Sequence, residues 1–154
     1  MPDVAVGQLP LDHLVFAVPR IDEYVEEFAD AMGVRPVFGG RHEGRGTKNY
    51  LLGFETGNEN PAYLELLGLD PEQSGGVLVG SVFGVGELGS DFRPHIRTWA
   101  IHPSDFEGTV SRVRAAGVDV GSVESMTRRT PEGEQLEWQL TVSPSLPERG
   151  LLPF

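Results

Sequence analysis

The feature that most constrains this chain is an internal repeat, in which the same order of elements occurs twice. In the first copy, a β-branched and aromatic run at 11–18 precedes an amphipathic stretch that closes with AMGV at 31–34. In the second copy, a similar run at 96–101 precedes a stretch that closes with AAGV at 115–118. The glycines of the two closing motifs lie 84 residues apart in a chain of 154 residues. Such a pattern indicates one supersecondary unit used twice.

Both amphipathic stretches are predicted helices. In the first copy, apolar residues recur at helical spacing over 21–32, and Gly33 is placed to end the helix. In the second copy, Ser104 and Glu107 have the spacing of a capping box, and Gly117 is placed to end the helix.

Each predicted helix is followed by further strand-like segments. They lie at 34–38, 47–55 and 62–68 in the first copy and at 122–129 and 135–142 in the second. We therefore assign the chain to the α+β class, as a single domain of two βαβββ modules. Because a lone module leaves one face of its sheet uncovered, we expect the modules to form a cleft or half-barrel with a ligand pocket between them. The modules span about 9–68 and 95–143, and a Gly-rich linker at 69–94 joins them, either as a linker with a short helix or as a lid over the pocket.

Composition and charge exclude several classes of function. The absence of cysteine rules out disulfides, thiolate metal sites and cysteine nucleophiles. The net charge of −11 disfavours binding to nucleic acid or to an anionic membrane. The sequence shows no signal peptide and no apolar run near the roughly 18 residues of a membrane span. We therefore predict a soluble, cytoplasmic protein whose ligand is a small molecule.

The segment FGGRHEGRGTKN at 38–49 is the most distinctive motif and carries the only lysine of the chain, Lys48. Its glycines permit positive φ and a close approach of the backbone to a ligand. Its two arginines can bind a carboxylate or phosphate bidentately. The spacing matches neither a Walker A loop nor a dinucleotide fingerprint. The segment is therefore either a substrate-binding loop or a solvated hairpin loop; the candidate substrate-binding residues in it are Arg41, His42, Arg45 and Asn49.

Together these elements resemble the vicinal oxygen chelate superfamily, with its glyoxalase, bleomycin-resistance and dioxygenase members, and in particular the bacterial glyoxalase-like domain branch. The resemblance rests on the order of elements and on LDHLVFAV (11–18), GVRPVFGGRHEGRGTKNYLL (33–52), AYLELLG (62–68), RTWAI (97–101), EWQLTV (137–142) and GLLPF (150–154). It implies a paired βαβββ fold, often homodimeric, with a divalent metal in the cleft. Active members of the superfamily use the metal to stabilise an enolate or oxyanion of the substrate. The resemblance also implies either a further segment after the apolar tail or docking of that tail on the core or a partner subunit.

The resemblance places metal ligands on matching strands of the two modules. In the first module it implies His13 and Glu65, which suit Zn, Ni, Mn or Fe. The alternatives are a hydrogen-bonded histidine at a strand start and a glutamate that faces solvent or pairs with an arginine. In the second module the pattern departs from the family, because Arg97, Thr98 and Trp99 stand near the counterpart of His13.

The counterpart of Glu65 in the second module falls at Gln139 or Glu137. A catalytic metal site usually has three protein ligands, so one of these would have to complete the set, with His42 or His102 as further options. Related proteins often carry histidine where Lys48 stands, and a lysine there would instead donate to a substrate oxyanion. Trp99 is a candidate for stacking on the ligand, although tryptophan is more often a core residue.

Three functions are compatible with these residues. The first is a glyoxalase-like lyase or isomerase with a divalent metal, in which Glu65 and Lys48 are catalytic and Arg41 and Arg45 orient an acidic group of the oxygenated substrate. The second is a metal-free binding protein that sequesters a hydrophobic or aromatic small molecule in the same cleft. The third is an assembly module in which the cleft is a relic. We expect an enzyme of the first kind and a homodimer.

Overall fold

The computed structural model describes residues 10–55, 61–73, 82–130 and 132–142. The elements follow the predicted order: β1 (Leu11–Ala17), α1 (Ile21–Met32), β2 (Val37–His42), β3 (Thr47–Gly53), β4 (Tyr63–Leu69), the short 3-10 helices η1 (Pro71–Gln73) and η2 (Val82–Leu88), β5 (His95–Ile101), α2 (Phe106–Ala115), β6 (Ser122–Arg129) and β7 (Gln135–Val142). The α+β class is confirmed. The predicted tail motif at 150–154 lies outside the described residues, as does the part of the linker at 74–81.

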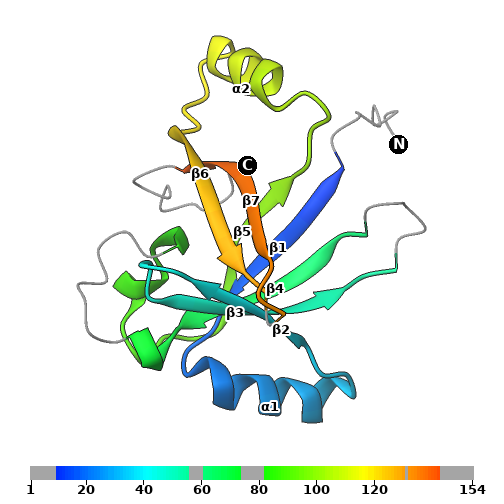
Figure 1. The fold of residues 1–154 in the computed structure, drawn as a ribbon, viewed down its shortest axis with the longest axis vertical. Helices are drawn as coiled ribbons and strands as arrows, with labels where there is room; N and C mark the ends of the chain where they lie inside the picture. Colours follow the sequence, from blue (N-terminus) through cyan, green and yellow to red (C-terminus); the bar gives the residue numbers. More distant parts are fainter. Residues whose placement is uncertain (1–9, 56–60, 74–81, 131, 143–154) are drawn as a thin grey trace.

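The strands form one open sheet in the order β5-β1-β4-β3-β2-β6-β7. Strands β1 and β4 run parallel, and the other neighbours run antiparallel. The link between β2 and β6 is a single residue pair, Arg41 opposite Arg129. The sheet therefore consists of a five-stranded body and a β6–β7 hairpin that rises from one side of it (Figure 1). Within the described residues the second repeat shows β5, α2, β6 and β7, one strand fewer than the first.

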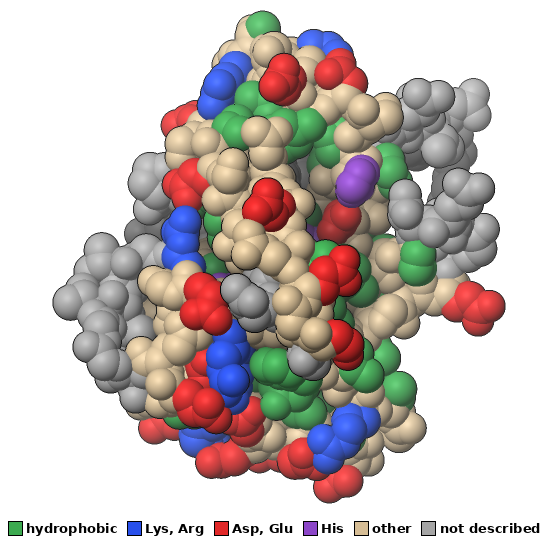
Figure 2. Space-filling model, viewed as in Figure 1, with side chains coloured by type: hydrophobic (Ala, Val, Ile, Leu, Met, Phe, Trp, Pro, Cys, Tyr) green, Lys and Arg blue, Asp and Glu red, His purple; other side chains and the backbone are tan. Residues whose placement is uncertain are grey.

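Each face of the five-stranded body is covered by a different element. Helix α1 lies under one face, at the opposite end of the molecule from α2 (Figure 1). There Ile21 and Val25 of the helix pack with Val18 and Leu66 in a buried cluster. On the other face, η2 supplies the buried residues Val82 and Val85, which pack with side chains of β1, β4 and β6: Val15, Ala17, Leu67 and Met126. Acidic side chains gather over the lower part of the surface, where α1 lies (Figure 2).

The C-terminal end of α1 follows the prediction, whereas the N-cap of α2 differs from it by one residue. Helix α1 ends at Gly33, whose φ of 69° is the left-handed conformation that favours glycine. Helix α2 is capped by Asp105, whose side chain accepts a hydrogen bond of 2.9 Å from the backbone N–H of Gly108. The predicted cap at Ser104 is thus wrong by one residue. Both residue types are good N-caps, and the sequence offers them side by side.

The predicted loop at 38–49 is largely a hairpin. Strand β2 continues to His42 and β3 begins at Thr47, so only four residues form the turn. His42 is paired with Thr47, and Arg41 with Lys48. Successive side chains of these strands therefore point to opposite faces of the sheet, which decides which members of the motif can reach a ligand. None of the described helices is long and apolar enough to cross a membrane.

Candidate functional site

A pocket of about 450 Å³ lies on the face of the five-stranded body that is turned away from α1. Strands β1, β2, β3 and β4 supply polar side chains to it, and the β6–β7 hairpin and η2 supply mainly apolar ones. The start of α2 contributes Phe106 at the rim. The volume falls within the range typical of small-molecule sites, roughly 300–1,000 Å³. The predicted cleft between the two repeats is therefore present as a pocket, and η2 of the predicted linker forms part of its wall.

The polar end of the pocket is centred on Glu65 of β4, which is 5% exposed. The amide nitrogen of Asn49 donates a hydrogen bond of 2.5 Å to Glu65 Oε1. The Nε2 atoms of His13 and His42 lie 3.5 Å from Oε2 and 4.0 Å from Oε1. A buried carboxylate is costly without hydrogen-bonding partners, and these three side chains from β1, β2 and β3 surround it.

The second nitrogen of each histidine ring is held by another side chain. Nδ1 of His13 lies 2.6 Å from the carboxylate of Asp12, and the ring stacks on Tyr63 with 4.7 Å between centroids. Nδ1 of His42 lies 2.9 Å from the hydroxyl of Thr47. Because Nδ1 is occupied in both rings, both Nε2 atoms are turned toward Glu65. Such outer partners fix ring orientation and tautomer.

Asp12 connects this cluster to the rim of the pocket. Its carboxylate also lies 3.1 Å from Nδ1 of His102, whose side chain is 65% exposed. The hydrogen bond with His13 is the main cause that holds the pKa of Asp12 below its ordinary value of 3.8, with a smaller contribution from His102 and partial burial acting in the opposite direction. Asp12 therefore remains a carboxylate at neutral pH.

The three cations of the 38–49 motif do not line the pocket. Lys48 is buried on the face that carries α1, where its Nζ lies 2.7 Å from Asp22. Arg41 donates to Asp70 at 2.8 Å from the same face. The proposed roles of Lys48 at a substrate oxyanion and of Arg41 at an acidic substrate group therefore conflict with the positions of these side chains.

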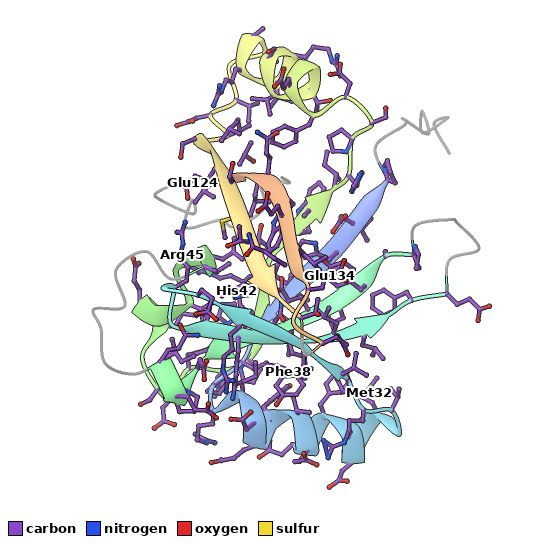
Figure 3. The ribbon with its side chains drawn as sticks, viewed as in Figure 1. Met32, Phe38, His42, Arg45, Glu124 and Glu134 are labelled. Carbon is purple, nitrogen blue, oxygen red and sulfur yellow. The ribbon has the colours of Figure 1, made fainter. Side chains whose placement is uncertain are left out.

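Arg45, the third cation of the motif, lies at the turn and pairs with β6. Its guanidinium lies 3.0 Å from Glu124, and the two side chains point toward each other at the outer edge of the hairpin, whereas His42 lies further inward (Figure 3). Of the candidate substrate-binding residues in the motif, the structure brings His42 and Asn49 together with Glu65 and places both arginines elsewhere.

The predicted metal donors come together only in part. His13 and Glu65 meet at the polar end of the pocket, and Gln139 lines its wall, whereas Glu137 is exposed and does not line it. Within the described part of the chain, no group of three or more His, Asp or Glu side chains could hold a metal ion. The donor set therefore falls short of the three protein ligands typical of a catalytic site.

The aromatic residues of the pocket differ from those predicted. Trp138 of β7, 36% exposed, lines the pocket, whereas Trp99 of β5 does not. Strand alternation gives the reason for Trp138, because Leu136 and Leu140 of the same strand also line the pocket. The lining residues that sequence reasoning did not single out include Asp12, Tyr63, Phe83 and Phe106. The position of Tyr63 two residues before Glu65 on β4 is a signal that could have found it.

Comparisons with known proteins agree with this architecture. A hypothetical protein from Staphylococcus aureus has a TM-score of 0.64 and 20% identity over 85% of this chain; the chain spans 51% of that protein's length. Methylmalonyl-CoA epimerase from Mycobacterium tuberculosis has a TM-score of 0.53 and 22% identity, with 88% of this chain and 82% of the epimerase covered. A methylmalonyl-CoA epimerase in complex with methylmalonyl-CoA and NH4+ has a TM-score of 0.58 and 20% identity over 90% and 99% of the two chains.

At these identities the solved structures show a shared fold. No curated protein matches the sequence. The family comparison is direct, because the profile of the glyoxalase-like domain matches residues 11–154. The match covers both repeats and every strand that contributes to the pocket. The epimerases of the same fold are members of the vicinal oxygen chelate superfamily, as the resemblance implied, and this chain belongs to the glyoxalase-like domain family.

Proposed function

We propose that the protein is a small-molecule enzyme of the isomerase or lyase type that moves a proton on an oxygenated substrate. The observation that carries the proposal is the buried Glu65 carboxylate at the polar end of the pocket, within 4.0 Å of two imidazole Nε2 atoms and hydrogen-bonded to Asn49. General acid–base catalysis requires a base and a donor in reach of the same substrate atoms. Glu65 supplies the first, and Asn49 and His42 supply the second.

In this mechanism Glu65 removes a proton from the carbon next to a substrate carbonyl. The electron pair of the broken C–H bond moves to the carbonyl oxygen, which becomes an enolate oxygen. The Asn49 amide and Nε2 of His42, in the tautomer whose Nδ1 accepts from the Thr47 hydroxyl, stabilise that oxygen by hydrogen bonding. Return of the proton by Glu65 to the neighbouring carbon gives an isomer, whereas an epimer requires a second acid that delivers a proton to the original carbon on its other face. The fold shared with methylmalonyl-CoA epimerases supports this reaction class.

Hydrogen–deuterium exchange in D2O tests the proposal, because exchange reports proton removal even when no net product forms. The substrates are 2-hydroxyacetophenone, an uncharged hydroxyketone, and methylmalonyl-CoA. We expect enzyme-dependent exchange with at least one of them, followed by NMR, and a decrease of about 100-fold or more in Glu65→Gln. Glu55→Gln, which changes an exposed carboxylate outside the pocket, is the control and retains the rate. Exchange that is equal in the two variants contradicts the proposal.

Metal binding is a separate proposal, because the described donor set does not assemble a three-ligand site. We propose His13 and Glu65 as primary donors for a divalent cation, with Gln139 as the third; a bound cation would polarise a substrate oxygen. Thermal unfolding with added Ni²⁺, Zn²⁺, Mn²⁺ or Fe²⁺ tests it. We expect a rise in Tm for the wild type that is lost in His13→Ala and reduced in Gln139→Ala. An equal rise in all three proteins contradicts the assignment.

A second candidate function is ligand binding without turnover. The observation that favours it is the apolar wall opposite Glu65, to which the hairpin contributes Met126, Leu136, Trp138 and Leu140. An apolar wall of this extent suits a hydrophobic or aromatic molecule held for sequestration. The exchange experiment separates the two candidates, since a binding protein would retain its ligand in Glu65→Gln without any enzyme-dependent exchange in the wild type.

A further inference from the structure

The charges that line the pocket are unlike those of a site for an anionic ligand. Asp12 and Glu65 both line it, and among the described lining residues there is no lysine or arginine. The remaining titratable groups facing the pocket are His13, His42, His102 and Tyr63. The rings of His13 and His42 lie beside Glu65, and the rings of His13 and His102 lie beside Asp12. Any positive charge on the rings is therefore already opposed by a carboxylate of the pocket itself.

Four described cations that do not line the pocket are each bound to a specific partner. Arg41 pairs with Asp70 and Glu72, Arg45 with Glu124, and Lys48 with Asp22. Arg97 donates from Nε to the backbone carbonyl of Phe83, at 2.9 Å, from behind the wall that Phe83 forms. Releasing one of these groups toward a ligand would leave its carboxylate or carbonyl partner without that bond, which opposes recruitment.

Apart from Gln139, the rest of the described pocket lining is apolar. Side chains of η2, β5, β6, β7 and α2 surround the polar end, with Phe83, Phe106 and Trp138 as the aromatic members. Aromatic faces attract cations as well as flat apolar rings. The pocket thus combines two carboxylates at one end with an apolar and aromatic wall around it.

We infer that this pocket admits an uncharged or cationic molecule with a large apolar or aromatic part, and selects against anions. The inference rests on the proposed function and deepens it, because it names the substrate class of the same site. It also replaces the expectation of an acidic substrate, which depended on Arg41 and Arg45 reaching the ligand.

A series of naphthalene compounds that differ only in charge tests the inference. The probes are 2-naphthylmethylammonium, 2-naphthamide and 2-naphthoate, titrated by calorimetry at about pH 8, where imidazole in water is uncharged. At low ionic strength we expect the ammonium compound to bind about tenfold or more tightly than the carboxylate, with the amide between them. The ratio shrinks at about 1 M salt because the pocket is open to solvent and its charges are screened.

Variants separate the charge effect from the apolar effect. We expect Glu65→Gln and Asp12→Asn each to reduce the preference for the ammonium compound over the carboxylate. Trp138→Ala weakens binding of all three probes and preserves their order. Glu137→Gln, an exposed acid on the same strand outside the pocket, is the matched control and leaves both affinity and order unchanged. Circular dichroism confirms that each variant is folded before titration.

Three results would overturn the inference. They are equal or tighter binding of 2-naphthoate by the wild type, an unchanged preference in both Glu65→Gln and Asp12→Asn, and failure of all three probes to bind. Because calorimetry requires no turnover, the charge preference is measured even if hydrogen–deuterium exchange fails. Conversely, exchange with methylmalonyl-CoA alone together with tight binding of 2-naphthoate would support the proposed reaction and reject this substrate class.

Discussion

Replacing Gly68 with alanine is expected to lower the free energy of unfolding by about 3 kcal/mol, at the upper end of the range for overpacked cores. Gly68 lies on β4 where the connection from β1 to α1 passes over the strand. A Cβ atom added there would lie 2.6 Å from Cβ of Ile21 and 2.9 Å from the backbone oxygen of Val18. Neither contact can be relieved by rotating a side chain, so the first turn of α1 would have to move away from the sheet.

Urea unfolding of Gly68→Ala beside Gly53→Ala measures this effect. Gly53 ends β3, and a Cβ atom added there meets nothing within 4 Å. We expect Gly53→Ala to change stability by no more than about 0.5 kcal/mol, the usual range for an exposed substitution. A loss below 1 kcal/mol in Gly68→Ala would show that the helix can shift without cost and would contradict the tight crossing seen here.

The parts of the fold that were predicted correctly depend on local patterns. The bounds of β6 and β7 agree with the predicted segments 122–129 and 135–142. Helix α1 ends at Gly33 as predicted, because its apolar spacing and its terminal glycine act within one segment. The pocket also follows from the repeat, since the exposed face of one unit must be covered by something else and a cleft was expected there.

The candidate site was predicted only in part, because its geometry depends on which face each side chain takes. His13 and Glu65, which were predicted to share a site, both line one pocket. Lys48 and Asn49 are adjacent in the sequence, yet one lies against α1 and the other contacts Glu65. We expected an anion-binding site at 38–49 because its residues are neighbours in the sequence. Adjacent residues of a strand instead point to opposite faces of the sheet. Strand register resolves the question, because a shift of one residue exchanges the two faces.

Partners in different elements were the other feature that the sequence could not reveal. Arg45 and Glu124 are 79 residues apart and meet only because the hairpin packs beside β2.

The contact between Asp12 and His13, which are neighbours in β1, was also not predictable. Strand alternation alone would turn the two side chains apart. The β1–β5 pairing has a register shift between Leu11 and His13, and the Asp12 carboxylate lies beside the His13 ring there.

Asp70 carries the second large expected effect, because its side chain is wholly buried beside two cations. Burial opposes ionisation of Asp70, but hydrogen bonds from the Gln73 side chain, from the Glu72 backbone N–H and from Arg41 together hold its pKa below 3.8. Lys48 Nζ lies 3.9 Å away and is itself 5% exposed. Removing the carboxylate takes away these hydrogen bonds and leaves Lys48 with Asp22 as its remaining carboxylate among the ion pairs described here.

We therefore expect Asp70→Ala to lower the free energy of unfolding by about 3 to 4 kcal/mol, as when one partner of a buried ion pair is removed. Asp91→Ala is the control, since Asp91 pairs with Arg20 at 2.8 Å but is 84% exposed; a surface pair contributes about 0–1 kcal/mol. Urea unfolding of Asp70→Ala, Lys48→Met and the double variant shows whether the loss of stability comes from the buried charge of Lys48. If the buried ammonium of Lys48, left with Asp22 alone, contributes to the loss, the double variant loses less than the sum of the two single losses.

The same carboxylate predicts a pH dependence with a defined direction. Because the folded pKa of Asp70 is below the unfolded value near 3.8, its stabilising contribution is complete above that pH and is lost as the pH falls through the folded pKa. The stability difference between wild type and Asp70→Ala should therefore shrink below about pH 4. Additive losses in the double variant, together with a difference that stays constant down to that pH, would show that Asp70 acts through packing rather than through its charge.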